Sequence, residues 1–243
     1  MHTWFLIALL GAATPYDDVQ IIAAASSPFR EYRLLKRNPK IPPEAYLKAA
    51  QGQIATGISA VEGYASKIGW GIGVIPVSMR HLFASINEEQ RHTAFTAVSH
   101  TSIVAGEPCS DGRMVFMILP LPVISDRWWV THQYTNAKIR QRSKGKVAEL
   151  VWQEATEWKA SAEHKIAIKD AVQVRFTRGS WLLIALDDNH TLAEYHSWVD
   201  PGGSIPVGPA SSFASGSIVD TFQQMETFAK SQSASQCDRM WKE

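Results

Sequence analysis

Charged residues are sparse in the 243-residue chain, where 24 Lys and Arg stand against 23 Asp and Glu and form no basic block. A nucleic-acid partner is not expected, because neutralising phosphates requires clustered Lys and Arg. The densest basic run, from Arg30 to Lys40, is short, and a solvated helix face explains it better than a binding patch. Disorder is excluded as well, since 45% of the residues are hydrophobic and 19% are charged.

The chain lacks an apolar run long enough to span a bilayer. Its first residues hold a seven-residue run, Trp4–Leu10, followed by Gly11-Ala12-Ala13, which suits cleavage after Ala13. Residues 1–13 are therefore predicted to be a signal peptide of a soluble, secreted or periplasmic protein with at most transient membrane contact. Because no Lys or Arg precedes the run, the alternative is an apolar helix packed on a cytoplasmic protein.

Cysteine is equally rare. Cys109 and Cys237 lie far apart in the sequence, and two unpaired thiols are the expected state. In an exported protein the alternative is a disulfide that ties the C-terminal tail, residues 233–243, to the Gly106–Gly112 loop. The eight histidines form neither a His-x-x-x-His pair nor a cluster with cysteine, so no metal site and no cofactor is expected.

Catalytic motifs are missing too. The Gly69–Gly73 segment imitates a dinucleotide loop, but it lies within a predicted strand and runs into Pro76, with no helix to hold a pyrophosphate. The Ser143–Lys146 spacing imitates a Ser-x-x-Lys nucleophile but falls in a predicted hairpin turn. Nothing in the sequence therefore compels an enzymatic interpretation.

Tryptophan, by contrast, is abundant: nine residues suit a protein that lines a large apolar space or forms an interface. Residues 14–51 are predicted to form a helical N-terminal extension. It comprises a helix over Asp17–Leu35, broken near Ser26-Ser27-Pro28, and a helix from Pro43 to about Gln51.

From Gly52 onward the hydrophobic period becomes that of strands, interrupted by a helix over Met79–Ile86 and closed by a long helix over Ser212–Ser231. A polar, possibly helical insert is expected around 157–163, and Arg178-Gly179-Ser180 and Asp187-Asp188-Asn189 are predicted turns. The predicted strands span residues 56–62, 67–77, 94–105, 113–121, 127–137, 147–154, 172–177, 181–186 and 191–199.

Short links between strands predict an antiparallel sheet, and only the last helix is long enough to cover its buried face. The fold class is therefore α+β: a helix-grip fold in which a large twisted antiparallel sheet wraps around the C-terminal helix, over residues 52–232. A sheet wrapped around one helix tends to leave a cavity between them, which is a route to ligand binding.

Three segments carry a resemblance to a known family. They are Val123–Val130, in which Asp126-Arg127 precedes an aromatic strand, Gly179-Ser180-Trp181, and Asp200–Pro206 with its Gly202-Gly203 turn. Together with the element order they resemble START domains, the lipid-transfer branch of the birch-allergen-like (SRPBCC) superfamily. The resemblance implies a cavity that binds or transports a lipid or other hydrophobic small molecule. The two glycines are expected to adopt positive φ in at least one position.

The chain departs from the family at Trp128-Trp129, where many members carry an acidic residue before the aromatic one. It departs again at Gln133, where some sterol and phospholipid binders place an arginine, and this puts a charged headgroup in doubt. Period 2 sets Trp129, Thr131 and Gln133 on the same face of their strand as Arg127, and the resemblance implies that this face lines the cavity. The predicted ligand-binding residues are Arg127, Trp129, Thr131, Gln133, Trp152, Phe222 and Met225.

Two alternatives remain at this point. Asp126-Arg127 also suits an ion pair or cap at the strand entrance rather than a ligand contact. An enzyme of the same superfamily, of cyclase or hydrolyase type, would use polar groups such as His132, Tyr134 or Glu194 for acid–base work.

Overall fold

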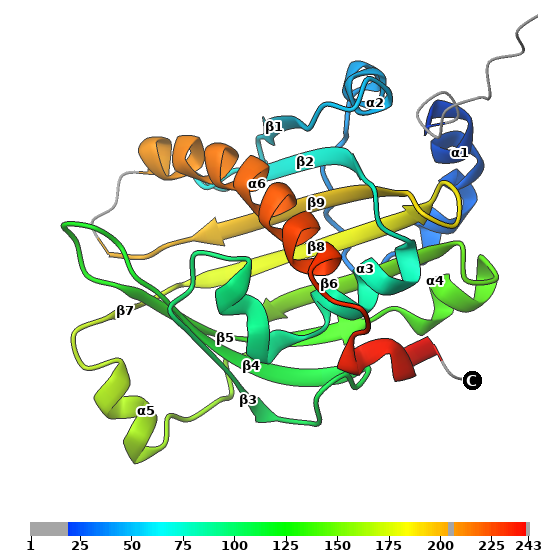
Figure 1. Ribbon diagram of the computed structural model, residues 1–243. Coiled ribbons are helices and arrows are strands. Elements are labelled where there is room, and N and C mark those ends of the chain that lie inside the picture. Colours follow the sequence, from blue (N-terminus) through cyan, green and yellow to red (C-terminus); the bar gives the residue numbers. More distant parts are fainter. Residues whose placement is uncertain (1–18, 204–206, 242–243) are drawn as a thin grey trace, which may run out of the picture.

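The computed structural model describes residues 19–203 and 207–241 (Figure 1). The predicted signal peptide, residues 1–13, lies outside the described residues. The N-terminal extension comprises α1 (Val19–Ala25), the 3-10 helix η1 (Ser27–Tyr32) and α2 (Pro43–Ala50). The predicted break after Ser26 is confirmed, and Pro43 opens α2, where its missing N–H costs nothing. The first helix, however, ends before Leu35, and residues 33–42 are extended.

The described strands form one nine-stranded sheet with the order β1-β2-β9-β8-β6-β5-β4-β3. All neighbours on this path are antiparallel, and the short β7 lies parallel to β5. The strands are β1 (Ala55–Ser59), β2 (Ile68–Ile75), β3 (His100–Ala105), β4 (Gly112–Leu119), β5 (Arg127–Thr135), β6 (Val147–Glu154), β7 (Val172–Gln173), β8 (Phe176–Ala185) and β9 (Thr191–Asp200).

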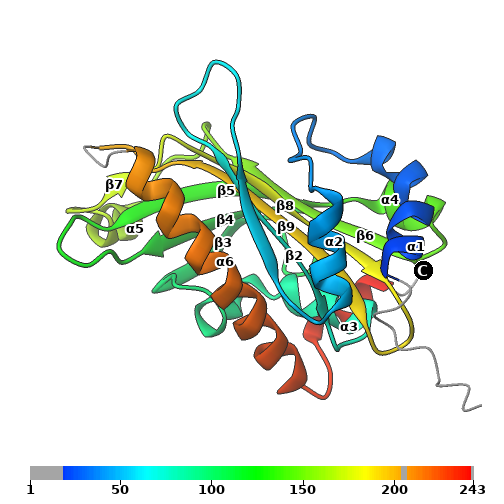
Figure 2. The same ribbon diagram turned by 90° about the horizontal axis from the view of Figure 1, so that it is seen from above.

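The long helix α6 (Val207–Lys230) crosses one face of this sheet (Figure 1), so the predicted α+β helix-grip fold is confirmed. Helix α1 lies on the opposite side of the sheet (Figure 2). The remaining helices are α3 (Met79–Ile86), η2 (Glu89–Ala94), α4 (Ala137–Arg142), α5 (Ala162–Ala167) and η3 (Gln236–Trp241).

Helix α6 can approach the sheet closely because β2 has glycines on the facing side. A Cβ at Gly71 would collide with Ile218, and one at Gly73 would lie 3.5 Å from the Phe222 ring. The alternating Gly69–Gly73 segment therefore lies within a strand and lets α6 pack closely against it. This agrees with the prediction that the segment is not a nucleotide-binding loop.

Several predicted boundaries were wrong. Arg178-Gly179-Ser180 is no turn but the middle of β8, where a Cβ on Gly179 would collide with the Trp152 ring. The glycine there serves close packing within a sheet. Two predicted strands are shorter than expected: the 94–105 strand begins only at His100, after η2 and a turn, and Asn136 ends the 127–137 strand. Asn136 caps the unpredicted α4 by accepting a hydrogen bond from the Ile139 N–H (3.1 Å).

The expectation of two free thiols was also wrong: Cys109 and Cys237 form a disulfide, with Cα atoms 5.1 Å apart. The bond ties η3 and the C-terminal tail to the loop between β3 and β4. The sequence separation of 128 positions hid this proximity, which arises only when the sheet is assembled.

No helix in the described part of the chain combines the length and apolarity needed to cross a membrane.

Candidate ligand site beneath helix α6

The strand register brings the predicted residues of β5 and β6 onto the face that α6 crosses, here called the grip face. Gln133 pairs with Trp152, and Trp152 pairs with Gly179. One row further, Trp181 pairs with Tyr195, and both pack in the core cluster that contains Phe222. Since side chains alternate along each strand, Trp129 and Thr131 share this face with Gln133.

Aromatic rings form a continuous ladder across the grip face. The Trp152 ring centroid lies 5.7 Å from that of Tyr195, which lies 4.7 Å from that of Trp181. Trp181 in turn lies 5.2 Å from Phe222 of α6. Phe222 and Met225 are fully buried and fix the helix on the sheet, so these two residues serve the fold.

The ladder is not sealed along its whole length. Trp129, Trp152 and Tyr195 are only partly buried, although they lie on the covered face. Burial raises the pKa of Tyr195 to about 12, against the effect of a hydrogen bond from Ser197. The Tyr195 ring is thus desolvated, although part of its surface remains accessible.

Next to these rings the sheet carries small residues. Ser197 pairs with Gly179 on one side and Gly69 on the other, so its neighbours present no side chains. The Trp152 ring leans over Gly179 into the room that results. The grip face therefore has an aromatic wall, and the small residues beside it leave the space into which the Trp152 ring packs.

Arg127 is engaged elsewhere. It is buried, and its guanidinium donates to the backbone oxygens of Pro201 (2.8 Å), Ser125 and Gly202 (3.5 Å). Its neighbour Asp126 accepts a hydrogen bond from the Leu121 N–H, so the two do not form the ion pair considered from sequence. Arg127 thus stabilises the connection between β9 and α6, and its guanidinium donors are mostly used by these backbone oxygens.

The same connection contains the predicted glycine turn. Gly202 and Gly203 have φ of 68° and 66°, which confirms the expected positive values. A Cβ on Gly202 would lie 2.9 Å from the Gln173 carbonyl oxygen. Both this contact and the positive φ therefore disfavour a larger residue.

Sequence reasoning missed a buried polar cluster beside Gln133. Arg113, its partner on β4, forms a buried ion pair with Glu89 of η2 and donates to Asn87 (2.8 Å). Burial lowers the pKa of Arg113 to about 10, which leaves it charged at neutral pH. Its Nε and Glu89 Oε2 are buried without a hydrogen-bond partner. Position 133 is a glutamine, but Arg113 on the adjacent strand places an arginine beside it. Only the strand register reveals that the two residues are neighbours.

The residues named for an acid–base role lie on the opposite, outer face of the sheet. His132 and Tyr134 alternate with the grip-face residues of β5, and their rings stack on each other. His132 contacts the exposed Glu157. Glu194 is bound by Arg30 and accepts a hydrogen bond from the Tyr46 hydroxyl (2.9 Å). The three residues therefore do not converge on the grip face.

The prediction that the basic run Arg30–Lys40 is a solvated helix face was wrong. The run forms a strap across the outer face of the sheet. Arg30 pairs with Glu194, and Arg33 donates to Glu149 at 2.8 Å. Both carboxylates are buried. Burial alone would lower the pKa of Arg30, but the hydrogen bonds and charge of Glu194 raise it above its usual range. The extension thus neutralises two buried charges of the sheet.

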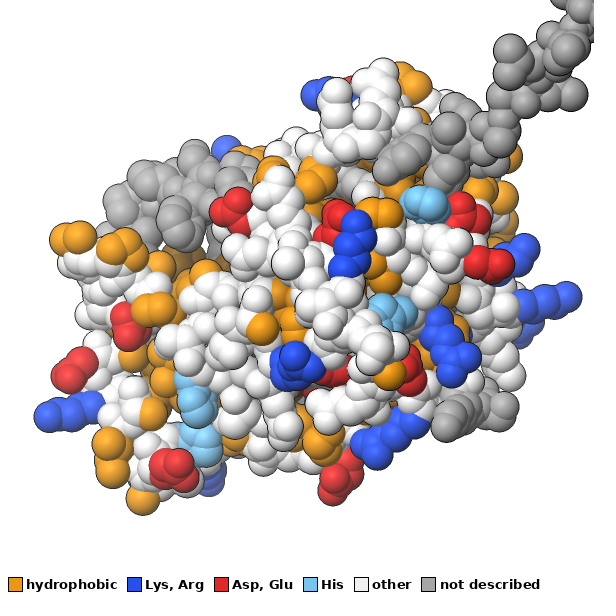
Figure 3. All heavy atoms as spheres, viewed as in Figure 1, with side chains coloured by type: hydrophobic (Ala, Val, Ile, Leu, Met, Phe, Trp, Pro, Cys, Tyr) orange, Lys and Arg blue, Asp and Glu red, His pale blue; other side chains and the backbone are white. Residues whose placement is uncertain are grey.

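Apolar side chains are exposed at the end of the molecule that carries the β4–β5 loop, α5 and the start of α6 (Figures 1 and 3). Val123 is fully exposed, and Ile124 and Ile166 are exposed as well. Val123 also adopts a φ of 73°, a strained conformation for a β-branched residue that commonly marks functional loops.

In the described part of the chain, no three His, Cys, Asp or Glu side chains gather as metal ligands would.

The architecture matches known structures. The STAR-related lipid transfer protein from Xanthomonas axonopodis superimposes with a TM-score of 0.60 at 15% identity, over 73% of this chain and 93% of that one. Human StAR-related lipid transfer protein 5 gives 0.60 at 13% identity, over 87% of this chain and 98% of that one. The protein has a START-like fold.

Human STARD10 also gives a TM-score of 0.60, at 13% identity, over 81% of this chain and 83% of that one. At these identities the likeness of the START-like chain to its neighbours shows the fold alone. Neither a family model nor a curated protein matches the sequence.

Proposed function

We propose that this START-like protein binds a lipid or other hydrophobic small molecule between its sheet and α6, and carries or senses it there. The observation that carries the proposal is the partly accessible aromatic wall of Trp129, Trp152 and Tyr195 on the covered grip face. The START-like fold supports it, because two of its structural neighbours are named lipid transfer proteins.

The wall favours a mostly apolar ligand with one uncharged polar group. Each buried methylene would contribute about 0.8 kcal/mol, so a chain of moderate length gives micromolar affinity after the costs of association. Arg113 is already paired with Glu89 and is not free to neutralise a charged headgroup. Its unpartnered Nε could instead take a hydroxyl or carbonyl oxygen that arrives beside Gln133.

Ligand exchange would take place at the end of the molecule that carries Val123 and Ile124. Their exposed side chains lie on the β4–β5 loop, near the start of α6 (Figure 1), and suit transient contact with a membrane surface. The disulfide favours an oxidising compartment and thereby supports the export predicted from residues 1–13.

The test is titration with an apolar fluorescent probe, 1-aminoanthracene, against two matched variants. Ser197→Trp adds a large side chain to the part of the grip face that carries small residues and should abolish binding. His132→Trp adds the same side chain to the outer face and should leave affinity unchanged. If both variants bind the probe as the wild type does, no ligand enters beneath α6. Equal losses in both would indicate surface adsorption.

The alternative, an enzyme of cyclase or hydrolyase type, has less support. Its candidate groups His132, Tyr134 and Glu194 are held on the outer face, two of them in contact with Glu157 or Arg30. No observation on the grip face favours acid–base chemistry over binding.

A further inference from the structure

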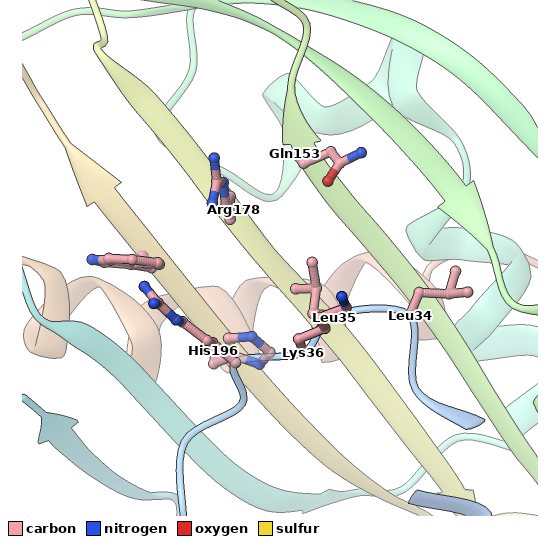
Figure 4. Close-up of a pocket in the computed structure, with 8 residues that line it drawn as sticks. Leu34, Leu35, Lys36, Gln153, Arg178 and His196 are labelled. Atoms are coloured by element: carbon pink, nitrogen blue, oxygen red, sulfur yellow. The ribbon is translucent and has the colours of Figure 1, made fainter. Parts of the chain in front are cut away.

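A pocket of about 350 Å³ opens on the outer face of the sheet, opposite the proposed ligand site. Gln153 of β6, Arg178 of β8 and His196 of β9 form its floor, and the extended strap at Leu34–Arg37 passes over them (Figure 4). Its volume lies within the range of small-molecule sites. The pocket exists only because the N-terminal extension crosses the sheet at this point.

The pocket has surplus positive charge. Lys36 and Arg37 form no ion pair with any carboxylate of the described residues, whereas Arg30 and Arg33 are paired with buried glutamates. Arg178 is bound to Glu154 through Nε and Nη2, and its Nη1 has no hydrogen-bond partner among the residues that the structure describes. Burial and the charge of Arg33 lower the pKa of His196 to about 3, so this floor residue is neutral.

Two of the cations, Arg37 and Arg178, lie against aromatic rings, whereas Lys36 is exposed. The Arg37 guanidinium lies 5.2 Å from the Tyr64 ring centroid and 5.7 Å from that of Trp198. The Arg178 guanidinium lies 5.9 Å from the same Trp198 ring. Stacking fixes the direction of both guanidinium groups, which lowers the entropic cost of binding an anion. Leu34 and Leu35 add apolar surface at the rim.

We infer that this outer pocket binds a small organic anion, a carboxylate or phosphate group on a compact apolar body. Lys36, Arg37 and the free Nη1 of Arg178 would bind the anionic group, and Leu34 and Leu35 would cover the apolar part. Charge-assisted hydrogen bonds to guanidinium groups supply the affinity. This site is distinct from the proposed lipid site, because the sheet separates the two.

The test uses 1-naphthyl phosphate as the probe and 1-naphthol as its uncharged counterpart, with binding measured by titration calorimetry. The phosphate should bind through the outer-face cations, whereas any binding of the naphthol, which lacks the anionic group, should not depend on Lys36 and Arg37. Lys36→Gln/Arg37→Gln should weaken binding about tenfold or more. Lys165→Gln/Lys169→Gln removes the same charge from α5 and the turn that follows it, outside the pocket, and should have no effect. If the first double variant does not fold, Lys36→Gln alone should still weaken binding, since Lys36 makes no described contact.

A competition experiment separates this pocket from the grip face. Protein saturated with 1-aminoanthracene should bind naphthyl phosphate as before. If the lipid proposal fails and 1-aminoanthracene does not bind, naphthyl phosphate should still bind. Displacement of one probe by the other would overturn the inference, because both would then occupy the interior. It would also be overturned by equal weakening in the two double variants, or by no binding of the phosphate at about 1 mM.

Discussion

The N-terminal strap is expected to be part of the folded unit, and Arg33→Met tests this most directly. The Arg33 side chain is 6% exposed and Glu149 is 0% exposed, so their pair is shielded from water. Glu149 also accepts hydrogen bonds from the Leu34 N–H (3.2 Å) and the Asn136 amide (2.8 Å). Removing the guanidinium leaves these neutral donors but takes away the cation that is paired with this buried carboxylate.

Breaking a buried ion pair from one side costs about 3–5 kcal/mol, because the remaining charge is uncompensated. For a domain of this size each kcal/mol lowers the unfolding midpoint by about 2–4 °C. Arg33→Met should therefore lower it by roughly 6–20 °C. The matched control is Arg175→Met, which breaks the exposed contact with Asp200 and should cost at most about 1 kcal/mol.

Thermal and urea unfolding followed by tryptophan fluorescence measures both variants. Glu149→Gln introduced into the Arg33→Met background should recover part of the loss, because it removes the stranded charge. The double-mutant cycle should give a coupling of about 1–3 kcal/mol. The reasoning is refuted if Arg33→Met costs no more than Arg175→Met, or if the cycle shows no coupling.

Three further outcomes are expected. Phe222→Ala should cost about 3–5 kcal/mol in urea unfolding, whereas Gln223→Ala, exposed on the same helix, should be neutral; equal costs would mean that α6 does not pack on the sheet. Gly71→Val should destabilise by about 1–3 kcal/mol, since the added side chain collides with the helix, and an unchanged midpoint would contradict the close approach. Reducing the Cys109–Cys237 disulfide should cost about 2–5 kcal/mol, measured as a lower midpoint in reductant, and two free thiols in non-reduced protein by mass spectrometry would argue against the bond.

The sequence by itself determined the element order and the fold class. Strand alternation, the Pro43 helix start and the helical spacing of Ile218, Phe222 and Met225 are local signals, readable within one or two turns of chain. Glycines misled where their role was not local. Gly179 looks like a turn residue, but it lies inside β8 because Trp152 on the neighbouring strand needs the space.

The arrangement of the site was partly predictable. Period 2 grouped Trp129, Thr131 and Gln133 on one face, but both faces of that strand carry aromatics, so only the resemblance gave it a direction. The polar partner of Gln133 could not be found from sequence, since Arg113 and Glu89 meet only through strand register and the packing of η2.

Tertiary structure alone decided the charge balance of the outer face and the pairing of the cysteines. Arg33 and Glu149 are 116 residues apart, and Cys109 and Cys237 are 128 apart. The basic run has the same composition whether it lies in solvent or across a sheet, and nothing local distinguishes the two. Hydrophobic period reports which side of an element is buried, whereas the partner of a charge or a thiol depends on which distant elements the fold brings against it.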